Sequence, residues 1–171
     1  MAWIKFQQRG QEVRGQEEVA SFLESQEVIY EHWDVNKLSE NLKENFTLSE
    51  EDKENILKTF ENEINEISAR RGYKAQDVIS LSDSTPNLDT LLDNFKKEHH
   101  HTDDEVRFIV SGHGIFVIQG KNGEFFDVNL DPGDLISVPE NVRHYFTLQE
   151  DRKVVAIRIF VTPEGWVPIY E

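Results

Sequence analysis

The chain has 171 residues, and its 33 acidic residues against 18 basic ones give a formal net charge of −15. This length is typical of one domain with a core of its own, and the acidic balance disfavours nucleic acid and anionic membranes as partners, since both need clustered Lys and Arg. Cysteine is absent, which excludes disulfides, thiolate-bound metals and a thiol nucleophile.

The sequence shows neither a membrane span nor a secretory signal. No apolar run approaches the roughly 18 residues of a spanning helix, and the first residues (MAWIKF) lack a basic region followed by an apolar stretch. We therefore expect a cytoplasmic protein without a membrane partner. Six His residues in a Cys-free chain are the one compositional hint of chemistry.

Residues 16–95 have the pattern of a helix-rich region. Asp34 is a candidate N-cap, and apolar residues follow it at helical spacing: Val35, Leu38, Leu42 and Phe46. Ser49 and Asp52 resemble a capping box, which predicts that the next helix begins there.

One apolar stripe continues behind that cap, and Gly72 is expected to end the helix. The stripe consists of Ile56, Phe60, Ile64 and Ile67. Residues 77–81 predict a short strand, and the Thr85–Pro86 pair predicts the start of another short helix.

From Glu98 onward the pattern changes to short runs rich in Val, Ile and Phe, separated by turn residues. The runs are residues 106–110, 114–119, 124–130, 135–138, 143–148 and 154–161. This spacing is typical of an antiparallel sandwich or barrel. No Gly/Ser/Pro-rich linker lies near residue 97, so we expect a single domain over residues 1–171, with a helix-rich part (1–97) and a β-rich part (98–171).

Three consecutive His residues and a later acid predict a metal site. In extended backbone His99 and His101 share a face and His100 points away, while Glu105 returns to the ligand side if residues 102–104 bend. With His144 from a later strand, this is a set of three nitrogens and one oxygen, which suits Fe, Mn, Co, Ni or Zn. Alternatively, the His run is a solvated surface patch and His144 a packed histidine.

The spacing His99-x-His101-x3-Glu105-x6-Gly112 resembles the first metal motif of the cupin superfamily, and Gly133-x5-Pro139-x4-His144 resembles most of the second. The chain departs from these motifs at three positions that are not ligands: Asp93, Asn141 and Leu148. The resemblance implies an α+β, mainly β fold: a cupin-type antiparallel β-barrel (jelly roll) with the helix-rich N-terminal half packed on it.

Longer segments are similar to the acireductone dioxygenase family of this superfamily. They are residues 85–89 (TPNLD), 95 with 98–101 (F, then EHHH), 103–108 (DDEVRF) and 138–146 (VPENVRHYF). This resemblance implies an enzyme of methionine salvage that cleaves 1,2-dihydroxy-5-(methylthio)pent-1-en-3-one, called acireductone, with O2. With Fe(II), the resemblance implies that the products are 4-methylthio-2-oxobutanoate and formate. With Ni(II), it implies 3-methylthiopropanoate, formate and carbon monoxide. One metal ion per chain is expected.

Further residues carry expected roles beside the metal ligands. Arg107 lies two residues beyond Glu105, on the same strand face, where a fixed cation would stabilise a dianionic substrate. The family resemblance implies that Glu98 assists metal incorporation and that Asp104 relays local conformational change. Arg158, if it points inward, needs a carboxylate partner, for which Glu98 and Glu105 are candidates.

Two other functions fit the same ligands. The first is a different metal-dependent cupin enzyme, either another dioxygenase or an isomerase, although a phosphate-binding isomerase would want more Lys and Arg than the second half offers. The second is a non-catalytic cupin that uses its metal only to hold a small ligand. We expect a monomer, because no long apolar stripe is left over.

Overall fold

The computed structural model describes residues 2–8, 10–43, 46, 48–82, 89–90, 99–100, 105–139, 142–149, 151–160 and 169–170. At positions 99, 100, 105, 160, 169 and 170 it describes the backbone alone. The predicted short helix after Pro86 lies almost wholly outside these residues.

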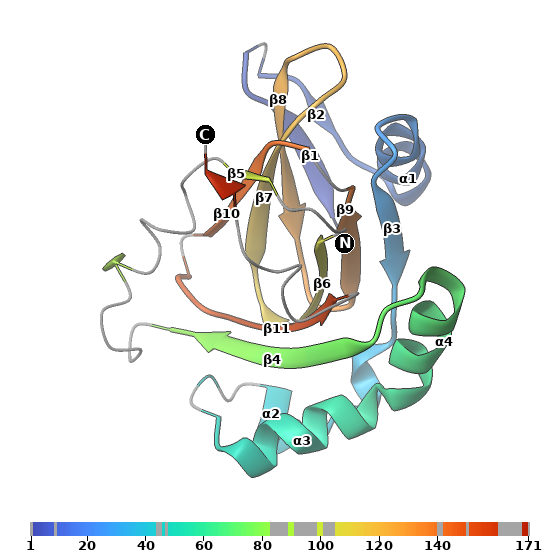
Figure 1. The fold of residues 1–171 in the computed structure, drawn as a ribbon. Helices are drawn as coiled ribbons and strands as arrows, with labels where there is room; N and C mark the ends of the chain where they lie inside the picture. The colour runs from blue at the N-terminus through green and yellow to red at the C-terminus, as the bar shows by residue number, and fades with distance from the viewer. Residues whose placement is uncertain are drawn as a thin grey trace.

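Antiparallel strands dominate the described part of the chain (Figure 1). In chain order they are β1 (Trp3–Phe6), β2 (Glu12–Val13), β3 (Ile29–His32), β4 (Ala75–Leu81), β5 (His99–His100), β6 (Glu105–Gly112), β7 (Gly114–Gln119), β8 (Phe125–Leu130), β9 (Asp134–Val138), β10 (His144–Leu148), β11 (Val154–Phe160) and β12 (Ile169–Tyr170). They form a seven-stranded sheet in the order β12-β5-β10-β7-β8-β1-β2 and a five-stranded sheet in the order β3-β9-β6-β11-β4.

The antiparallel architecture confirms the expectation of an α+β, mainly β fold, and its strands form two sheets, as those of a jelly roll do. One correction concerns the first half of the chain. It is less purely helical than its pattern indicates, because β1 and β2 extend one sheet while β3 and β4 form both edges of the other. The N-terminal part is therefore built into the sheets and does not merely pack on them.

Most of the helices lie on one face of the five-stranded sheet: the 3₁₀ helix η1 (Val35–Lys37), α2 (Glu40–Lys43), α3 (Glu50–Thr59) and α4 (Glu61–Arg71). The first helix, α1 (Gln16–Ser25), instead buries Val19 and Leu23 in the core between the two sheets. The predicted helix behind Asp34 is broken into η1 and α2, although Asp34 does cap η1 by accepting from the Asn36 backbone N–H. No helix within the described ranges is long and apolar enough to cross a bilayer.

The capping predictions for the longer helices are confirmed. Ser49 and Asp52 form a reciprocal capping box at the start of α3, and Gly72 adopts a left-handed conformation (φ 77°) at the end of α4. The single predicted helix is divided at Phe60, which ends α3 and precedes α4. The apolar stripe survives this break, because all four of its residues are buried.

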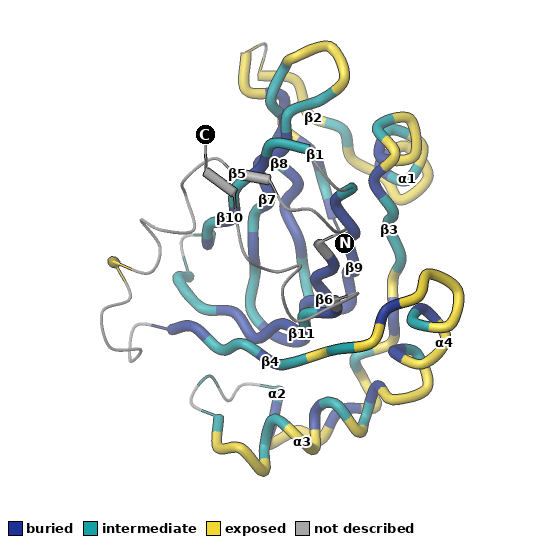
Figure 2. The backbone as a smooth tube through the Cα atoms, viewed as in Figure 1, coloured by how far each residue is buried: buried dark blue, intermediate teal, exposed yellow. Residues whose placement is uncertain are grey.

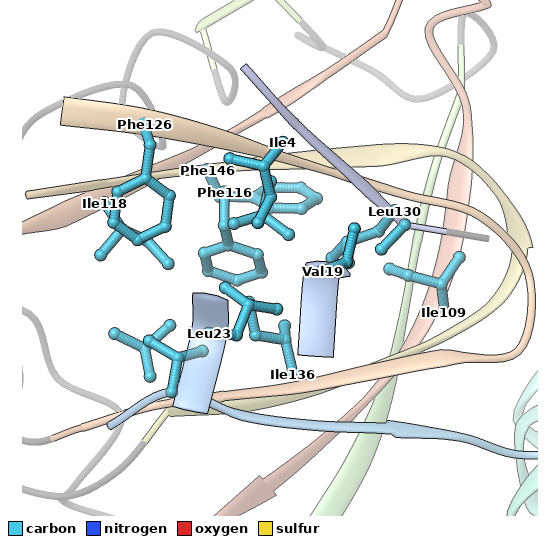
Figure 3. Packing of buried hydrophobic residues seen from close by; sticks show 14 of the residues in the cluster. Ile4, Val19, Leu23, Ile109, Phe116, Ile118, Phe126, Leu130, Ile136 and Phe146 are labelled. Carbon is cyan, nitrogen blue, oxygen red and sulfur yellow. The ribbon is translucent and has the colours of Figure 1, made fainter. Parts of the chain in front are cut away.

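The two faces of the five-stranded sheet have separate cores. On the helix side Phe108 packs against Phe60 and Trp33, with ring centroids 4.9 and 4.6 Å apart. Between the two sheets a second cluster contains Ile109, Ile136 and, from the other sheet, Phe116; Figure 3 shows these side chains converging. Figure 2 shows the buried strands at the centre and the exposed outer surfaces of the helices. Alternate residues of β6 thus face opposite cores.

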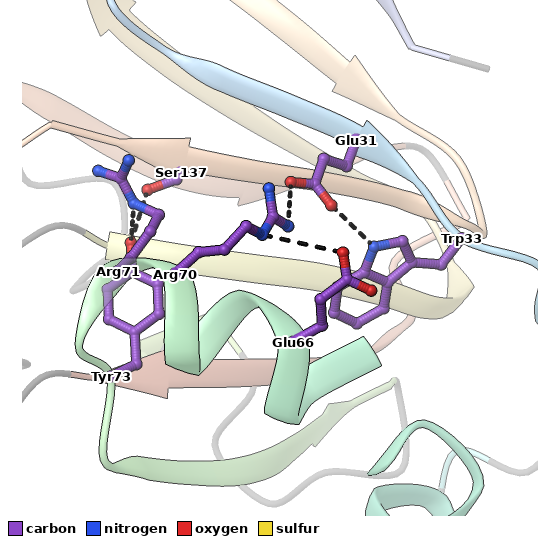
Figure 4. Close-up of polar contacts among 7 residues, drawn as sticks. All are labelled: Glu31, Trp33, Glu66, Arg70, Arg71, Tyr73 and Ser137. Carbon is purple, nitrogen blue, oxygen red and sulfur yellow. Dashed lines mark hydrogen bonds and ion pairs between the residues drawn. The ribbon is translucent and has the colours of Figure 1, made fainter. Parts of the chain in front are cut away.

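Polar contacts fix α4 to the sheet edge (Figure 4). Arg70 pairs with Glu31 of β3 at 2.9 Å, and the same carboxylate accepts from the Trp33 indole N–H at 3.1 Å. Arg71 donates to the Tyr73 hydroxyl at 2.8 Å, and that oxygen lies 3.5 Å from the Ser137 hydroxyl of β9. The helical layer is therefore attached at both its apolar and its polar positions.

Candidate metal centre

His144 lies at the start of β10 and is buried, with 1% of its surface exposed. Along β10, buried and partly exposed residues alternate, so His144 shares the interior face with Phe146. Its Nδ1 lies 2.8 Å from the Val142 carbonyl oxygen, a contact in which the ring N–H donates. A histidine held in this way presents Nε2 as the metal-ligating nitrogen, and the carbonyl fixes the ring orientation.

The backbone brings a second predicted ligand directly beside His144. In the register of β10 and β5, His144 lies opposite His99, and opposite residues of antiparallel strands have Cα atoms about 4.5–5.5 Å apart. The next residue, His100, lies opposite Ile169 of β12. Two positions 45 residues apart in the sequence are thus neighbours in one sheet.

The third described position is contributed by the facing sheet. Glu105 begins β6 opposite Val138 of β9. Two residues further, Arg107 lies opposite Ile136, which belongs to the core between the sheets. Arg107 is 8% exposed, and its guanidinium donates to the Val106 carbonyl at 3.4 Å. Arg107 therefore lies on the interior face, as the alternation along the strand predicts.

Several predicted site residues lie outside the described ranges, namely Glu98, His101 and Asp104. The structure therefore leaves the full ligand set and the roles of Glu98 and Asp104 as predictions. Among the residues whose side chains are described, no cluster of three or more His, Asp or Glu could hold a metal by itself.

The glycines of both resembled motifs have backbone reasons to be glycine. Gly112 has φ 73°, and a Cβ there would lie 2.2 Å from the Lys153 carbonyl oxygen. Gly133 has φ 97°, and a Cβ there would lie 2.8 Å from the Trp33 carbonyl oxygen. L-residues disfavour this left-handed backbone, and both contacts are to main chain that cannot move aside, so only glycine fits.

Arg158 has a carboxylate partner that the sequence did not indicate. Its Nε donates to Asp77 Oδ1 at 2.8 Å and its Nη2 donates to the other carboxylate oxygen. Asp77 is on β4, directly opposite Arg158 in the register of β11. The sequence predicts a strand at residues 77–81, but it does not contain the register with β11 that places Asp77 opposite Arg158.

His113 has acidic partners away from this centre. His113 Nδ1 is 2.6 Å from Asp151 Oδ2, and its Nε2 is 3.6 Å from Asp131 Oδ1. The ring lines a pocket of about 280 Å³ at the Gly112 end of β6, whereas Glu105 begins that strand. Seven residues of strand span about 23 Å, so this pocket is separate from the candidate metal centre.

His32 lies beside a buried acid, Asp134. Asp134, fully buried, accepts from the Tyr30 hydroxyl at 2.6 Å and from the Asp131 backbone N–H at 2.8 Å, and lies 3.2 Å from His32 Nδ1. Burial, and then the hydrogen bond and negative charge of Asp134, raise the pKa of Tyr30 well above its ordinary value. The contacts of Asp134 with Tyr30 and His32 join β9 to β3.

Phe95, Phe108, Phe146 and Trp166 are candidates for lining a substrate pocket, and the two that the structure describes belong to different cores. Phe146 lies between the sheets, with its ring 5.0 Å from that of Phe116, and Phe116 in turn lies 6.1 Å from the His144 ring. Phe108 faces the helices instead, so it packs the outer core and does not line the site. Phe95 and Trp166 lie outside the described ranges.

Comparisons with known proteins agree over nearly the whole chain. The sequence model of the ARD/ARD' family matches residues 1–168. A protein of Bacillus subtilis (strain 168) named acireductone dioxygenase is 77% identical over 159 residues, covering 93% of this chain and 89% of its own. One of the same name from Bacillus thuringiensis subsp. konkukian is 67% identical over 170 residues, covering 99% of this chain and 100% of its own.

A solved structure gives the same result. Acireductone dioxygenase from Bacillus anthracis with a cadmium ion in its active centre is 65% identical to this chain and superposes with a TM-score of 0.97. The match covers 99% of this chain and 98% of that one. Both the sequence and the arrangement of the sheets are therefore shared.

Proposed function

Because the chain belongs to the ARD/ARD' family, we propose that His99, His101, Glu105 and His144 bind one divalent metal ion per chain. Its activity is that of a metal-dependent acireductone dioxygenase, an oxidoreductase that acts on a small molecule and dioxygen. The observation that carries the ligand assignment is the register of β10 and β5, which sets His144 opposite His99.

The residues present fit such an ion. The donor set is three imidazoles and one carboxylate, which suits both Fe(II) and Ni(II) and needs no thiolate. His144 is buried and oriented through its Nδ1 by the Val142 carbonyl, the arrangement common among metal-bound histidines. A bound divalent ion would supply a Lewis-acid centre that favours the deprotonated enediol.

The protein's own contribution is to bind and orient an anion in a dry site. Arg107 lies on the interior face, 8% exposed, where a fixed guanidinium is poorly screened by water and can stabilise a dianionic substrate. Phe146 and Phe116 keep the adjacent interior apolar, which excludes water from the same region. We propose that Arg107 holds the dianion, that Glu98 assists metal incorporation and that Asp104 relays local conformational change.

The product set follows from the metal. We propose that the Fe(II) form yields 4-methylthio-2-oxobutanoate and formate, and that the Ni(II) form yields 3-methylthiopropanoate, formate and carbon monoxide. We further propose that the protein acts in the cytoplasm as a monomer, without nucleic-acid or membrane partners, in keeping with its net charge of −15.

The activity is tested by loading the protein anaerobically with Fe(II) and mixing it with acireductone and oxygen. We expect the ultraviolet absorbance of the substrate to disappear much faster than with metal-free protein. Parallel loading with Ni(II) should release carbon monoxide, and Fe(II) loading should not. Substrate loss no faster than in buffer would contradict the proposed function.

The ligand assignment is tested by the metal content of His144→Ala. Removing a ligand should lower the bound metal at least tenfold, since loss of even an outer partner of a ligand costs 10–100-fold in affinity. The matched control is His113→Ala, because His113 pairs with Asp151 far from the centre. Equal metal content in the two variants would contradict the assignment.

A further inference from the structure

Two arginines lie side by side on the interior face of the five-stranded sheet. Arg158 of β11 is directly opposite Arg107 of β6, and side chains at such positions have Cβ atoms about 4.5–5.5 Å apart. Arg107 is 8% exposed and the Arg158 side chain 20% exposed. Like charges placed opposite each other are destabilising, and buried charges are costly unless they are paired. This juxtaposition therefore needs anions close by.

Asp77 supplies one of these anions and determines where Arg158 lies. Its carboxylate accepts from both Nε and Nη2 of Arg158, the Nε distance being 2.8 Å. A two-point contact of this kind fixes the plane and direction of a guanidinium, not only its position. The order Asp77, Arg158, Arg107 follows three neighbouring strands, β4, β11 and β6.

The row formed by Asp77, Arg158 and Arg107 has different neighbours on its two sides. Toward the Gly112 end of β6, the next row of interior residues is apolar, with Ile79 opposite Ala156 and Ala156 opposite Ile109. In the opposite direction the next interior row contains Glu105. The neighbouring guanidiniums of Arg107 and Arg158 thus lie between the apolar core and the predicted ligand Glu105. Together with the Asp77 carboxylate they carry a net positive charge.

We propose that Asp77 is a positioning residue: it holds Arg158 beside Arg107, so that two guanidiniums face the anionic substrate at the metal centre. This inference rests on the proposed function, since it concerns the same substrate. Asp77 does not touch substrate; it acts through Arg158. The alternative is a contact that only joins β4 to β11, and the two roles predict different kinetics.

The test compares Asp77→Asn with Asp77→Glu in the Fe(II)-loaded full-length protein. Asp77→Asn keeps the shape and removes the charge, so Arg158 loses its fixed orientation. We expect KM for acireductone to rise about tenfold, while kcat at its pH plateau changes less than twofold and metal content stays the same; a rise in KM alone marks lost binding that is equal in ground and transition states. Asp77→Glu keeps the charge and should return KM to within about threefold of the parent.

A pH profile separates positioning from strand joining. Less well-placed cations stabilise the bound dianion less, so its protonation should occur at higher pH. The acid limb of kcat, which reports groups of the enzyme–substrate complex, should therefore move upward in Asp77→Asn. A contact that only joins strands would not move it. The matched control is Asp127→Asn. Asp127 is an acid on β8 of the seven-stranded sheet, and its carboxylate accepts from the side-chain amide of Gln7.

Arg158→Lys provides a second variant if Asp77→Asn does not fold. It keeps the charge but loses the two-point contact, and it should raise KM in the same direction. If the parent does not consume acireductone, the proposed function fails. If the parent is active but Asp77→Asn keeps the parental KM and pH profile, or loses only thermal stability, the positioning role is wrong.

Discussion

At the scale of single residues, Asp134 shows how this fold tolerates a fully buried acid. Its carboxylate accepts from the Tyr30 hydroxyl and the Asp131 backbone N–H and lies beside His32. Buried carboxylates are stabilised only where such donors surround them. Tyr30 and His32 are both on β3, and Asp134 is on β9. Asp134 therefore helps to hold β3, which is an edge strand of the described five-stranded sheet and pairs there only with β9.

Tyr30→Phe should lower the free energy of unfolding at neutral pH by about 1–3 kcal/mol, because it leaves buried Asp134 short of a donor. The loss should shrink above pH 10. The pKa of Tyr30 is raised in the folded protein, so above about pH 10 the unfolded tyrosine ionises first, and the folded state binds more protons. The parental stability from this group is therefore complete below pH 10 and declines as the pH rises. Urea unfolding at pH 7, 9 and 11 measures the difference.

Tyr145→Phe is the matched control for Tyr30→Phe. Tyr145 is a partly exposed tyrosine of β10, and its replacement should change stability little. If the deficit of Tyr30→Phe stays constant or grows between pH 7 and pH 11, then the shifted ionisation of Tyr30 does not contribute to stability.

The candidate site was predictable at this scale only in part. Ligand identities followed from motif spacing, but spacing alone could not place His99 opposite His144, because strand register depends on partners distant in sequence. Asp77 was missed for the same reason. An acid on a predicted strand has no visible role until the neighbouring strand is known to place an arginine opposite it.

At the scale of elements, the six runs predicted between residues 106 and 161 are confirmed as strands, whereas the short β12 was not predicted. The observed β7 coincides with the predicted run 114–119, and β6, β8, β9, β10 and β11 differ by at most two residues at either end. The turn at residues 121–123 joins β7 to β8. These strands combine apolar runs with Gly, Asn and Asp turns, so local signals suffice.

The strands of the first half were largely missed, and the reason is physical. β1 and β3 have four residues each, too few for a clear alternation. Their partners are remote: Trp3 pairs with Asn129, and Ile29 pairs with Ser137. Strand formation here is decided by the edge that β8 or β9 offers, which local propensity does not contain. The break at Phe60 was missed because the apolar stripe continues unchanged across it.

The turn between β6 and β7 gives an element-scale prediction. Gly112→Ala should destabilise the protein by about 2 kcal/mol more than Gly123→Ala. Both glycines have positive φ, 73° and 85°, but a Cβ at Gly123 meets nothing within 4 Å while one at Gly112 meets the Lys153 carbonyl. Each variant therefore bears the left-handed strain of about 1–2 kcal/mol, and only Gly112→Ala must also displace β11 backbone.

Denaturant unfolding of the two glycine variants measures this difference. Both variants should retain their metal content. For Gly112→Ala the reason is that Gly112 lies at the far end of β6 from Glu105. Equal stabilities would mean that the close approach of the β11 backbone to Gly112 is relieved without cost.

At the scale of the whole molecule, the net charge of the chain and the charge of the Asp77–Arg158–Arg107 row have opposite signs. The chain carries −15, yet the interior row contains Arg107 and Arg158 with Asp77 as the carboxylate that holds Arg158. The first turns of α1, α3 and α4 each contain acidic residues. Whole-chain charge therefore informs about surface partners, whereas the charge of a bound small molecule depends on the few groups in the interior.

The two sheets also predict that the β-rich part cannot fold alone. A fragment of residues 98–171 would lack β1, the neighbour of β8, and both edge strands of the five-stranded sheet, β3 and β4. It would also lack the helices that cover Val155 and Ile157. Since exposed apolar strand faces and unpaired edges are unstable in water, we expect no cooperative thermal transition by circular dichroism and no retained metal. The full-length chain should unfold in one transition, as a single domain does. A fragment that unfolds cooperatively and binds Fe(II) would instead make residues 98–171 an autonomous domain, with the first 97 residues an accessory layer.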